Sequence, residues 1–161
     1  MKRFFLLTAI TFGFFLLEFV FYHLFGRWFK PNFIILLVIF FNVFFETKYS
    51  LFVAIVGGIL KDSFSTIGFG TYTFSFIVCS YLVTLIRKYF YQVESGYLRI
   101  VVVVVLCFVN SLIVGAVSFS SGFFRLEEIA MYVLLPEALA TIVVAVYTFQ
   151  KLRLCVLKLS V

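Results

Sequence analysis

Charged residues are scarce in this chain of 161 residues. Only 12% of the residues are charged, whereas 65% are hydrophobic and 25 residues are phenylalanine. A typical soluble domain has about 25% charged and about 45–50% apolar residues. A chain with so few polar side chains cannot cover its apolar surface in water, so the composition predicts an all-α integral membrane protein.

The residue types that build most catalytic and metal sites are also few. The chain has one histidine and three cysteines, and Cys79, Cys107 and Cys155 show no metal-binding or disulfide spacing. The sequence contains no Ser/His/Asp set, no HExxH motif and no phosphate-binding loop. We therefore expect neither an enzyme nor a protein that holds a metal or another cofactor.

The net charge of +6 would suit nucleic acid as a partner, but the distribution of the charge does not. The Lys and Arg residues lie between apolar runs and not on one face, which is the pattern that orients membrane helices. We therefore expect the surroundings of this chain to be a lipid bilayer, and we exclude nucleic acid.

Six apolar runs predict one compact helical bundle, a single domain over residues 1–161. The first run is too long for the apolar core of a signal peptide, so we interpret it as a retained helix. The second and third runs are shorter than the ~20 residues that a bilayer requires. They could cross a locally thinned bilayer, be partly buried in the bundle, or form re-entrant segments. The expected spans are residues 4–25, 33–46, 49–64, 71–86, 98–119 and 128–149.

The basic residues between these runs predict the orientation of the chain. With six spans and the N-terminus inside, nine basic residues fall on the inner side and four on the outer side, so both termini are expected to be cytoplasmic. The inner set is Lys2, Arg3, Lys48, Arg87, Lys88, Arg99, Lys151, Arg153 and Lys158, and the outer set is Arg27, Lys30, Lys61 and Arg125.

Charge, small residues and a flexible backbone coincide only in residues 51–72. The Gly57-Gly58 pair predicts close packing of a short helix against its neighbours. Gly68 and Gly70 allow the chain to reverse direction into the next helix. We expect these four glycines to have a structural role.

A few polar side chains lie within or beside the apolar runs. A carboxylate in lipid costs at least ~2.5 kcal/mol on insertion scales, so these side chains should face the interior of the bundle. One interpretation is hydrogen bonding between helices by protonated carboxyls, and the other is a transport path or proton relay. The residues are Glu18, Asn42, Asp62, Asn110 and Glu137.

Asp62 and Pro136 carry more specific expectations. Asp62 is expected to hold the turn that follows it by accepting hydrogen bonds from backbone N–H or hydroxyl groups of residues 63–71. Pro136 cannot donate to the carbonyl group of Tyr132, so it predicts a kink in the sixth helix. A protonated Glu137 can hydrogen-bond backbone groups that this kink frees.

Several motifs follow one another in a characteristic order from Lys30 onward. The chain reads KPN, an apolar run, a polar break, a run ending in GGILKDSFSTIGFG, and a further apolar run. This order resembles the MreD family, the small membrane proteins of the bacterial rod-shape system, and LPEALATIVVAVY at residues 135–147 resembles the last span of that family. Lys61 departs from the family pattern, in which a leucine-like residue is common. The matching residues are Pro31, Gly58, Asp62, Ser63, Ser65, Gly68 and Gly70.

The resemblance implies a non-enzymatic scaffold of the cell-elongation complex in the bacterial inner (plasma) membrane, similar in fold to the S components of energy-coupling-factor transporters. It implies MreC as the main partner, with RodA, a class B penicillin-binding protein and MreB in a wider complex that organises peptidoglycan synthesis. Self-association of the chain into a homo-oligomer is a further possibility that the resemblance leaves open. The alternative function is a substrate-binding subunit of an energy-coupling-factor vitamin transporter, with Trp28, Asn32 and the turn at residues 63–72 near its pocket.

Overall fold

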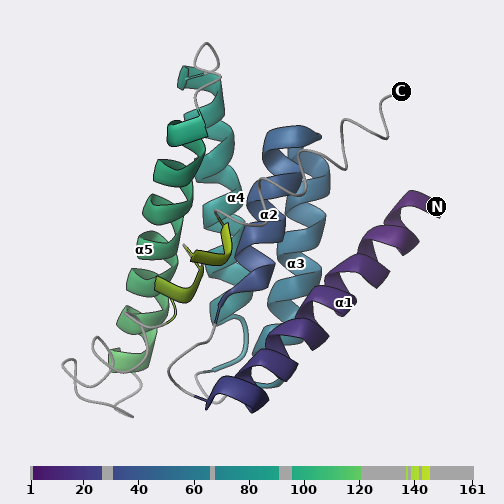
Figure 1. Cartoon of the computed structure of the whole chain (residues 1–161), viewed down its shortest axis with the longest axis vertical. Coiled ribbons are helices and arrows are strands. Elements are labelled where there is room, and N and C mark those ends of the chain that lie inside the picture. Colours follow the sequence, from purple (N-terminus) through teal and green to yellow (C-terminus); the bar gives the residue numbers. More distant parts are fainter. Residues whose placement is uncertain are drawn as a thin grey trace.

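The computed structural model describes residues 2–26, 31–65, 68–90, 96–120, 137, 139–141 and 143–145 of the chain. These residues are helical wherever they have regular secondary structure, and no strand is found among them. Five helices follow one another and lie side by side in a bundle, with the helical residues between 137 and 145 beside them (Figure 1). The helices are α1 (Lys2–Phe25), α2 (Phe33–Phe44), α3 (Thr47–Ser63), α4 (Thr71–Phe90) and α5 (Gly96–Ser120).

Each of the first five apolar runs forms one helix, as the sequence predicts, but some ends differ. The helix α4 does not stop before Arg87 and continues to Phe90. The helix α2 ends at Phe44, and α3 already begins at Thr47, so two residues connect them. Most of the predicted sixth span, residues 128–149, lies outside the described residues.

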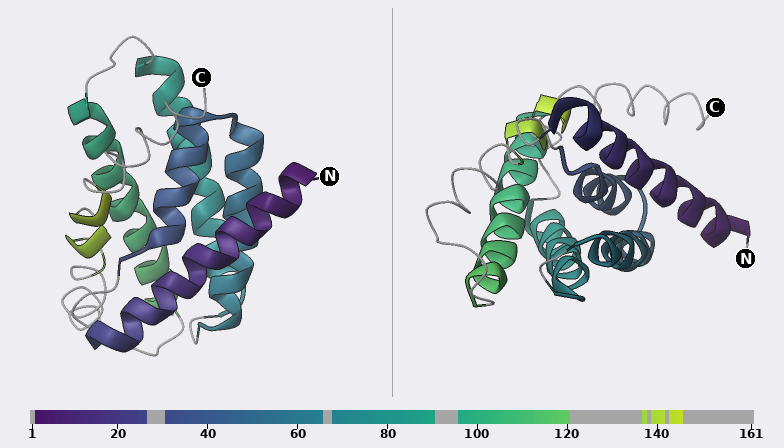
Figure 2. Two further views of the ribbon diagram at one scale, coloured as in Figure 1. Left: turned by 45° about the vertical axis from the view of Figure 1, so that its right-hand side comes forward. Right: turned by 90° about the horizontal axis from the view of Figure 1, so that it is seen from below.

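The short helix α2 lies at the centre of the bundle. All residues from Phe33 to Asn42 are buried, and α2 contacts α1, α3, α4 and α5. Figure 2 shows these four helices around it when the bundle is viewed from below. Twelve residues extend about 18 Å, less than the ~30 Å of a hydrocarbon core. Of the three interpretations of its short length, burial in the bundle is the one that the structure supports.

The helix α1 covers α2 and α3 with one narrow stripe. Its buried residues Leu7, Thr11, Phe15 and Glu18 recur every three or four positions, as one face of a helix requires. The rings of Phe15 and Phe64 lie 5.3 Å apart between centroids, close to the C-terminal end of α3. The rest of α1 is largely exposed and apolar, and Figure 1 shows the helix running obliquely across the bundle.

A neutral polar network fixes α2, α3 and α4 against each other. Asn42 Nδ2 donates to the backbone oxygen of Ser80 and to Thr84 Oγ1, both at 2.9 Å. Ser50 Oγ donates to the carbonyl oxygen of Val38 at 2.9 Å and also lies 2.8 Å from Ser80 Oγ. Buried polar groups of this kind are stable in a core only when they are paired, so the network sets the register of the three helices.

The C-terminal end of α2 is closed by Arg87 of α4. The Arg87 guanidinium donates to the carbonyl oxygens of Asn42 and Phe45, groups that have no partner within a helix that ends there. Continuing α4 past Ile86 is what places Arg87 beside α2.

Two described helices are long and apolar enough to cross a membrane. They are Phe4–Phe25 in α1 and Val101–Ser120 in α5. Length and composition are the basis of this assignment.

Candidate functional site

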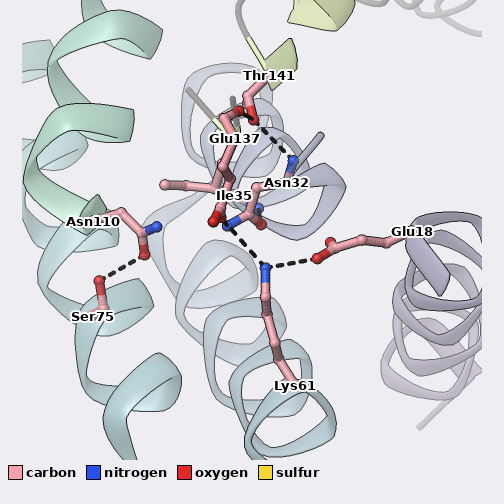
Figure 3. Close-up of polar contacts among 8 residues, drawn as sticks. All are labelled: Glu18, Asn32, Ile35, Lys61, Ser75, Asn110, Glu137 and Thr141. Carbon is pink, nitrogen blue, oxygen red and sulfur yellow. Dashed lines mark hydrogen bonds and ion pairs between the residues drawn. The ribbon is translucent and has the colours of Figure 1, made fainter. Parts of the chain in front are cut away.

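A cluster of three charged side chains lies buried near the N-terminal end of α2, and we call Glu18, Lys61 and Glu137 the charge cluster. Lys61 Nζ is 2.7 Å from Glu18 Oε1 and 3.7 Å from Glu137 Oε1. Lys61 and Glu18 are each 6% exposed, and Glu137 is 5% exposed. Figure 3 shows the lysine reaching between the two carboxyl groups. Burial of unpaired charge is costly, so the pairing explains how three charges can occupy an apolar bundle.

The charge cluster joins three parts of the chain that are far apart in sequence. Glu18 comes from α1, Lys61 from α3, and Glu137 from the helical residues of the sixth run. Asn32, at the start of α2, adds the fourth part, because its Nδ2 donates to Glu137 Oε1 at 2.8 Å.

Asn32 has three roles at this end of α2. Its Oδ1 accepts a hydrogen bond from the Ile35 N–H at 3.2 Å, which caps the helix. Its own N–H donates to Thr141 Oγ1 at 2.9 Å, and Thr141 Oγ1 donates in turn to the Glu137 carbonyl oxygen (Figure 3). The backbone and side chain of this one residue thus fix the start of α2 against the sixth run.

Two aromatic rings complete the surroundings of the lysine. Lys61 Nζ lies 4.9 Å from the centroid of the Tyr72 ring and 5.7 Å from that of Phe76. Both rings belong to α4, and cation–π contacts of this length stabilise a desolvated ammonium group. The positive charge is therefore supported from α4 as well as by the two carboxyl groups.

Asp62, next to Lys61, binds the first turn of α4. Its Oδ1 accepts the Tyr72 N–H at 2.9 Å, and its Oδ2 accepts the Thr73 N–H at 3.0 Å and the Thr73 hydroxyl at 2.6 Å. The sequence predicts such bonds with residues 63–71, and the partners are instead Tyr72 and Thr73. The reason is that unpaired N–H groups and the positive end of the helix dipole lie in the first turn of α4, where a carboxylate binds best.

The predicted glycines of α3 lie at two close helix contacts. A Cβ atom on Gly57 would clash with the Ile34 side chain on α2. A Cβ atom on Gly58 would lie 2.9 Å from the backbone nitrogen of Thr73 on α4. Side chains at these positions would push α3 away from its neighbours.

The remaining predicted residues occupy the turns. Gly68 and Gly70 have φ angles of 93° and 98°, which residues with a Cβ rarely adopt. Pro31 is buried directly before the Asn32 cap. Pro136 lies outside the described residues, so its predicted kink stays a prediction.

The sequence predicts Lys61 among the basic residues of the outer side, and the structure places its side chain in the interior of the bundle. Without Lys61, the six-span prediction gives nine inner and three outer basic residues. The signal that identifies it is periodicity: the buried residues of α3 follow an i, i+3, i+4 pattern that includes Lys61. They are Ser50, Val53, Ala54, Gly57, Gly58, Lys61 and Asp62.

Beside Glu137, the described residues pack closely. Asn32, Asn110, Ser111 and Glu137 line a space between α2, α5 and the sixth run, but no water-sized volume is left among them. Asn110 accepts a hydrogen bond from Ser75 at 2.8 Å (Figure 3). In the part of the chain that the structure describes, no group of three or more His, Cys, Asp and Glu residues could hold a metal ion.

One comparison with known proteins identifies a relationship. Residues 1–155 match the sequence model of MreD, described as rod shape-determining protein MreD. No curated protein and no solved structure matches the chain.

Proposed function

The chain belongs to the MreD family, and from this we propose that it is a non-enzymatic scaffold of the bacterial cell-elongation complex. Membership implies a membrane protein with a role in rod shape determination. The proposal adds that it binds MreC as its main partner and helps to organise peptidoglycan synthesis with RodA, a class B penicillin-binding protein and MreB. The observation that carries the proposal is the match over residues 1–155, nearly the whole chain.

The geometry of the described residues supports a scaffold in two ways. The buried polar groups mainly join helix to helix, as Asp62 joins α3 to α4 and Asn32 joins α2 to the sixth run. The outer faces of α1 and α5 carry exposed apolar side chains, among them Phe5, Phe12 and Phe108. Such a bundle holds its own shape while offering apolar surface to lipid or to partner helices.

We further propose that the chain is one six-span domain with an S-component-like fold and cytoplasmic termini in the inner membrane. The nine-to-three distribution of basic residues supports this orientation. A reporter fused after Val161 tests it. Activity of a cytoplasmic reporter is expected, and activity of a periplasmic reporter would contradict the six-span topology.

Co-expression tests the partner. A tagged chain expressed with an MreC-type protein should retain it through detergent solubilisation and size-exclusion chromatography. The Gly58→Leu variant, which pushes α3 from Thr73, should retain less of it, whereas Ser63→Ala on the exposed side of α3 serves as control. Complete absence of the complex with the wild-type chain would overturn the proposed partner.

Native mass spectrometry of the purified protein separates the scaffold from a ligand-binding subunit. The scaffold should show the mass of the protein with lipid or detergent alone. A stoichiometric polar small molecule that survives purification would overturn the scaffold role.

A further inference from the structure

The turn between α3 and α4 exposes aromatic side chains and no charge. Its sequence, SFSTIGFG, contains no charged residue. Phe64 is 70% exposed and Phe69 is 78% exposed. The charged residues directly before the turn, Lys61 and Asp62, are buried and paired inside the bundle. Two large aromatic rings therefore face the surroundings of the protein at this end of the two helices.

The other end of α3 and α4 is charged. Glu46 and Lys48 form an exposed ion pair at the start of α3. Lys88, which is also exposed, lies in the last turn of α4. Exposed charge at the end of a membrane helix belongs at the polar boundary of the bilayer, because a charge within the hydrocarbon is costly. We therefore expect this end of both helices at one surface of the membrane.

Neither helix is long enough to carry the turn from that surface across a full bilayer. Along α3, the rise of a helix places Ser63 about 23 Å from Lys48. Along α4, it places Thr71 about 26 Å from Lys88. The hydrocarbon core of a bilayer is ~30 Å thick, and any tilt of the helices shortens the distance that they cover across it. Two separate helices thus place the turn short of the opposite surface.

Polar groups of the turn are paired within the protein. The N–H groups of Phe64 and Ser65 donate to carbonyl oxygens in the last turn of α3, at 3.2 Å each. The Thr71 hydroxyl donates to the Gly68 carbonyl oxygen at 3.1 Å. Asp62 accepts N–H groups from the first turn of α4. Backbone at membrane depth requires such pairing, because hydrocarbon offers no hydrogen-bond partner.

We propose that the turn between α3 and α4 lies among the acyl chains of the leaflet opposite Lys48 and Lys88, with Phe64 and Phe69 in contact with lipid. Acyl chains fit this surface better than water does, because the exposed rings have no exposed charge beside them. The two helices then enter and leave the membrane at the same surface. This inference rests on the proposed membrane domain and not on any partner protein.

Fluorescence quenching in reconstituted vesicles tests the proposal. Trp28, the only tryptophan, is first replaced by phenylalanine, and Phe69→Trp then places a single fluorescent probe at the turn. Phosphatidylcholine with brominated acyl chains quenches a probe that touches lipid, and iodide in the buffer quenches a probe that touches water. We expect brominated lipid to quench Phe69→Trp strongly, and iodide to leave most of its emission.

Two other exposed aromatic residues provide matched controls. Phe108 lies in the middle of α5, and Tyr89 follows Lys88 at the charged end of α4. Brominated lipid should quench Phe108→Trp, and iodide should quench Tyr89→Trp. The ratio of lipid quenching to iodide quenching in Phe69→Trp should be close to the ratio in Phe108→Trp and well above that in Tyr89→Trp.

The controls separate the ways in which the proposal can fail. Iodide quenching of Phe69→Trp equal to that of Tyr89→Trp would place the turn in water and overturn the proposal. A Phe69→Trp probe that neither quencher reaches would show that protein covers the turn, which also overturns it. If brominated lipid does not quench Phe108→Trp either, the proposed membrane domain itself fails. If Phe69→Trp does not fold, Phe64→Trp replaces it, with the same expected and contradicting results.

Discussion

Asn32 and Asn42 lie at opposite ends of the buried helix α2, and each donates from its side-chain amide to a neighbouring part of the chain. Asn32 donates to the carboxylate of Glu137, whereas Asn42 donates to the Ser80 backbone oxygen and the Thr84 hydroxyl. The N-terminal end of α2 is therefore held by a hydrogen bond to a carboxylate. The C-terminal end is held by hydrogen bonds to hydroxyl and carbonyl groups, and Arg87 donates to its last carbonyl oxygens.

The difference shows two ways of placing polar groups in an apolar bundle. In the neutral network, the hydroxyl groups of Ser50, Ser80 and Thr84 form hydrogen bonds with each other or with carbonyl oxygens. Each of these bonds therefore contributes only part of the stabilisation. In the charge cluster, one ammonium group serves two carboxyl groups, and Glu18 Oε2 has no partner among the described residues. The neutral end should therefore tolerate single changes better than the charged end.

The largest expected effect comes from removing the shared cation. Lys61→Met leaves two buried carboxyl groups without their ammonium partner and should cost about 3–5 kcal/mol of stability. Thermal unfolding in detergent, followed by size-exclusion chromatography, measures the loss. The matched control is Lys48→Met, whose exposed pair with Glu46 should contribute less than ~1 kcal/mol. Equal effects of the two changes would contradict the importance of the charge cluster.

An intermediate effect is expected from Asp62→Ala. The change removes three hydrogen bonds at the first turn of α4 and should cost about 3 kcal/mol, given ~1.5–3 kcal/mol for one bond to a charged group and incomplete additivity. Asp62→Asn keeps one acceptor oxygen and should lose less. The same unfolding assay applies, and a wild-type midpoint for Asp62→Ala would show that α4 does not need this anchor.

The smallest expected difference separates the two asparagines. Asn32→Ala removes a helix cap and a donor to a carboxylate, whereas Asn42→Ala removes the hydrogen bonds of its amide with Ser80 and Thr84, which are neutral groups. We expect Asn32→Ala to be the more destabilising by about 1 kcal/mol, since bonds to charged groups are worth more than neutral ones. Unfolding midpoints measured side by side decide this. A larger loss in Asn42→Ala would reverse the comparison.

Much of the helix order follows from the sequence. Apolar runs locate the five helices, and the Pro31-Asn32 pair marks the start of α2. The acceptor role of Asp62 follows from its position before a Ser- and Gly-rich turn, although its partners lie one and two residues past the predicted range. These features can be predicted from neighbouring residues in the sequence, without knowing which helices are in contact.

The pairing within the charge cluster does not follow from local signals. Glu18, Lys61 and Glu137 are separated by many residues, and a lone lysine near the end of an apolar run is ordinarily a surface charge. Helical periodicity places Lys61 on the inner face of α3 and Glu18 on the inner face of α1. Their meeting depends on how α1 crosses α3, which is a property of the packed bundle.

The burial of α2 also has a consequence for how the chain enters the membrane. A helix of 12 residues that four other helices surround has no stable position of its own in lipid, because its polar ends would meet hydrocarbon before Asn32 and Asn42 find their partners. Two residues, Phe45 and Glu46, join it to α3. We therefore expect α2 to depend on the contacts of its neighbours, with α3 joined to it directly and α4 and α5 needed to enclose it.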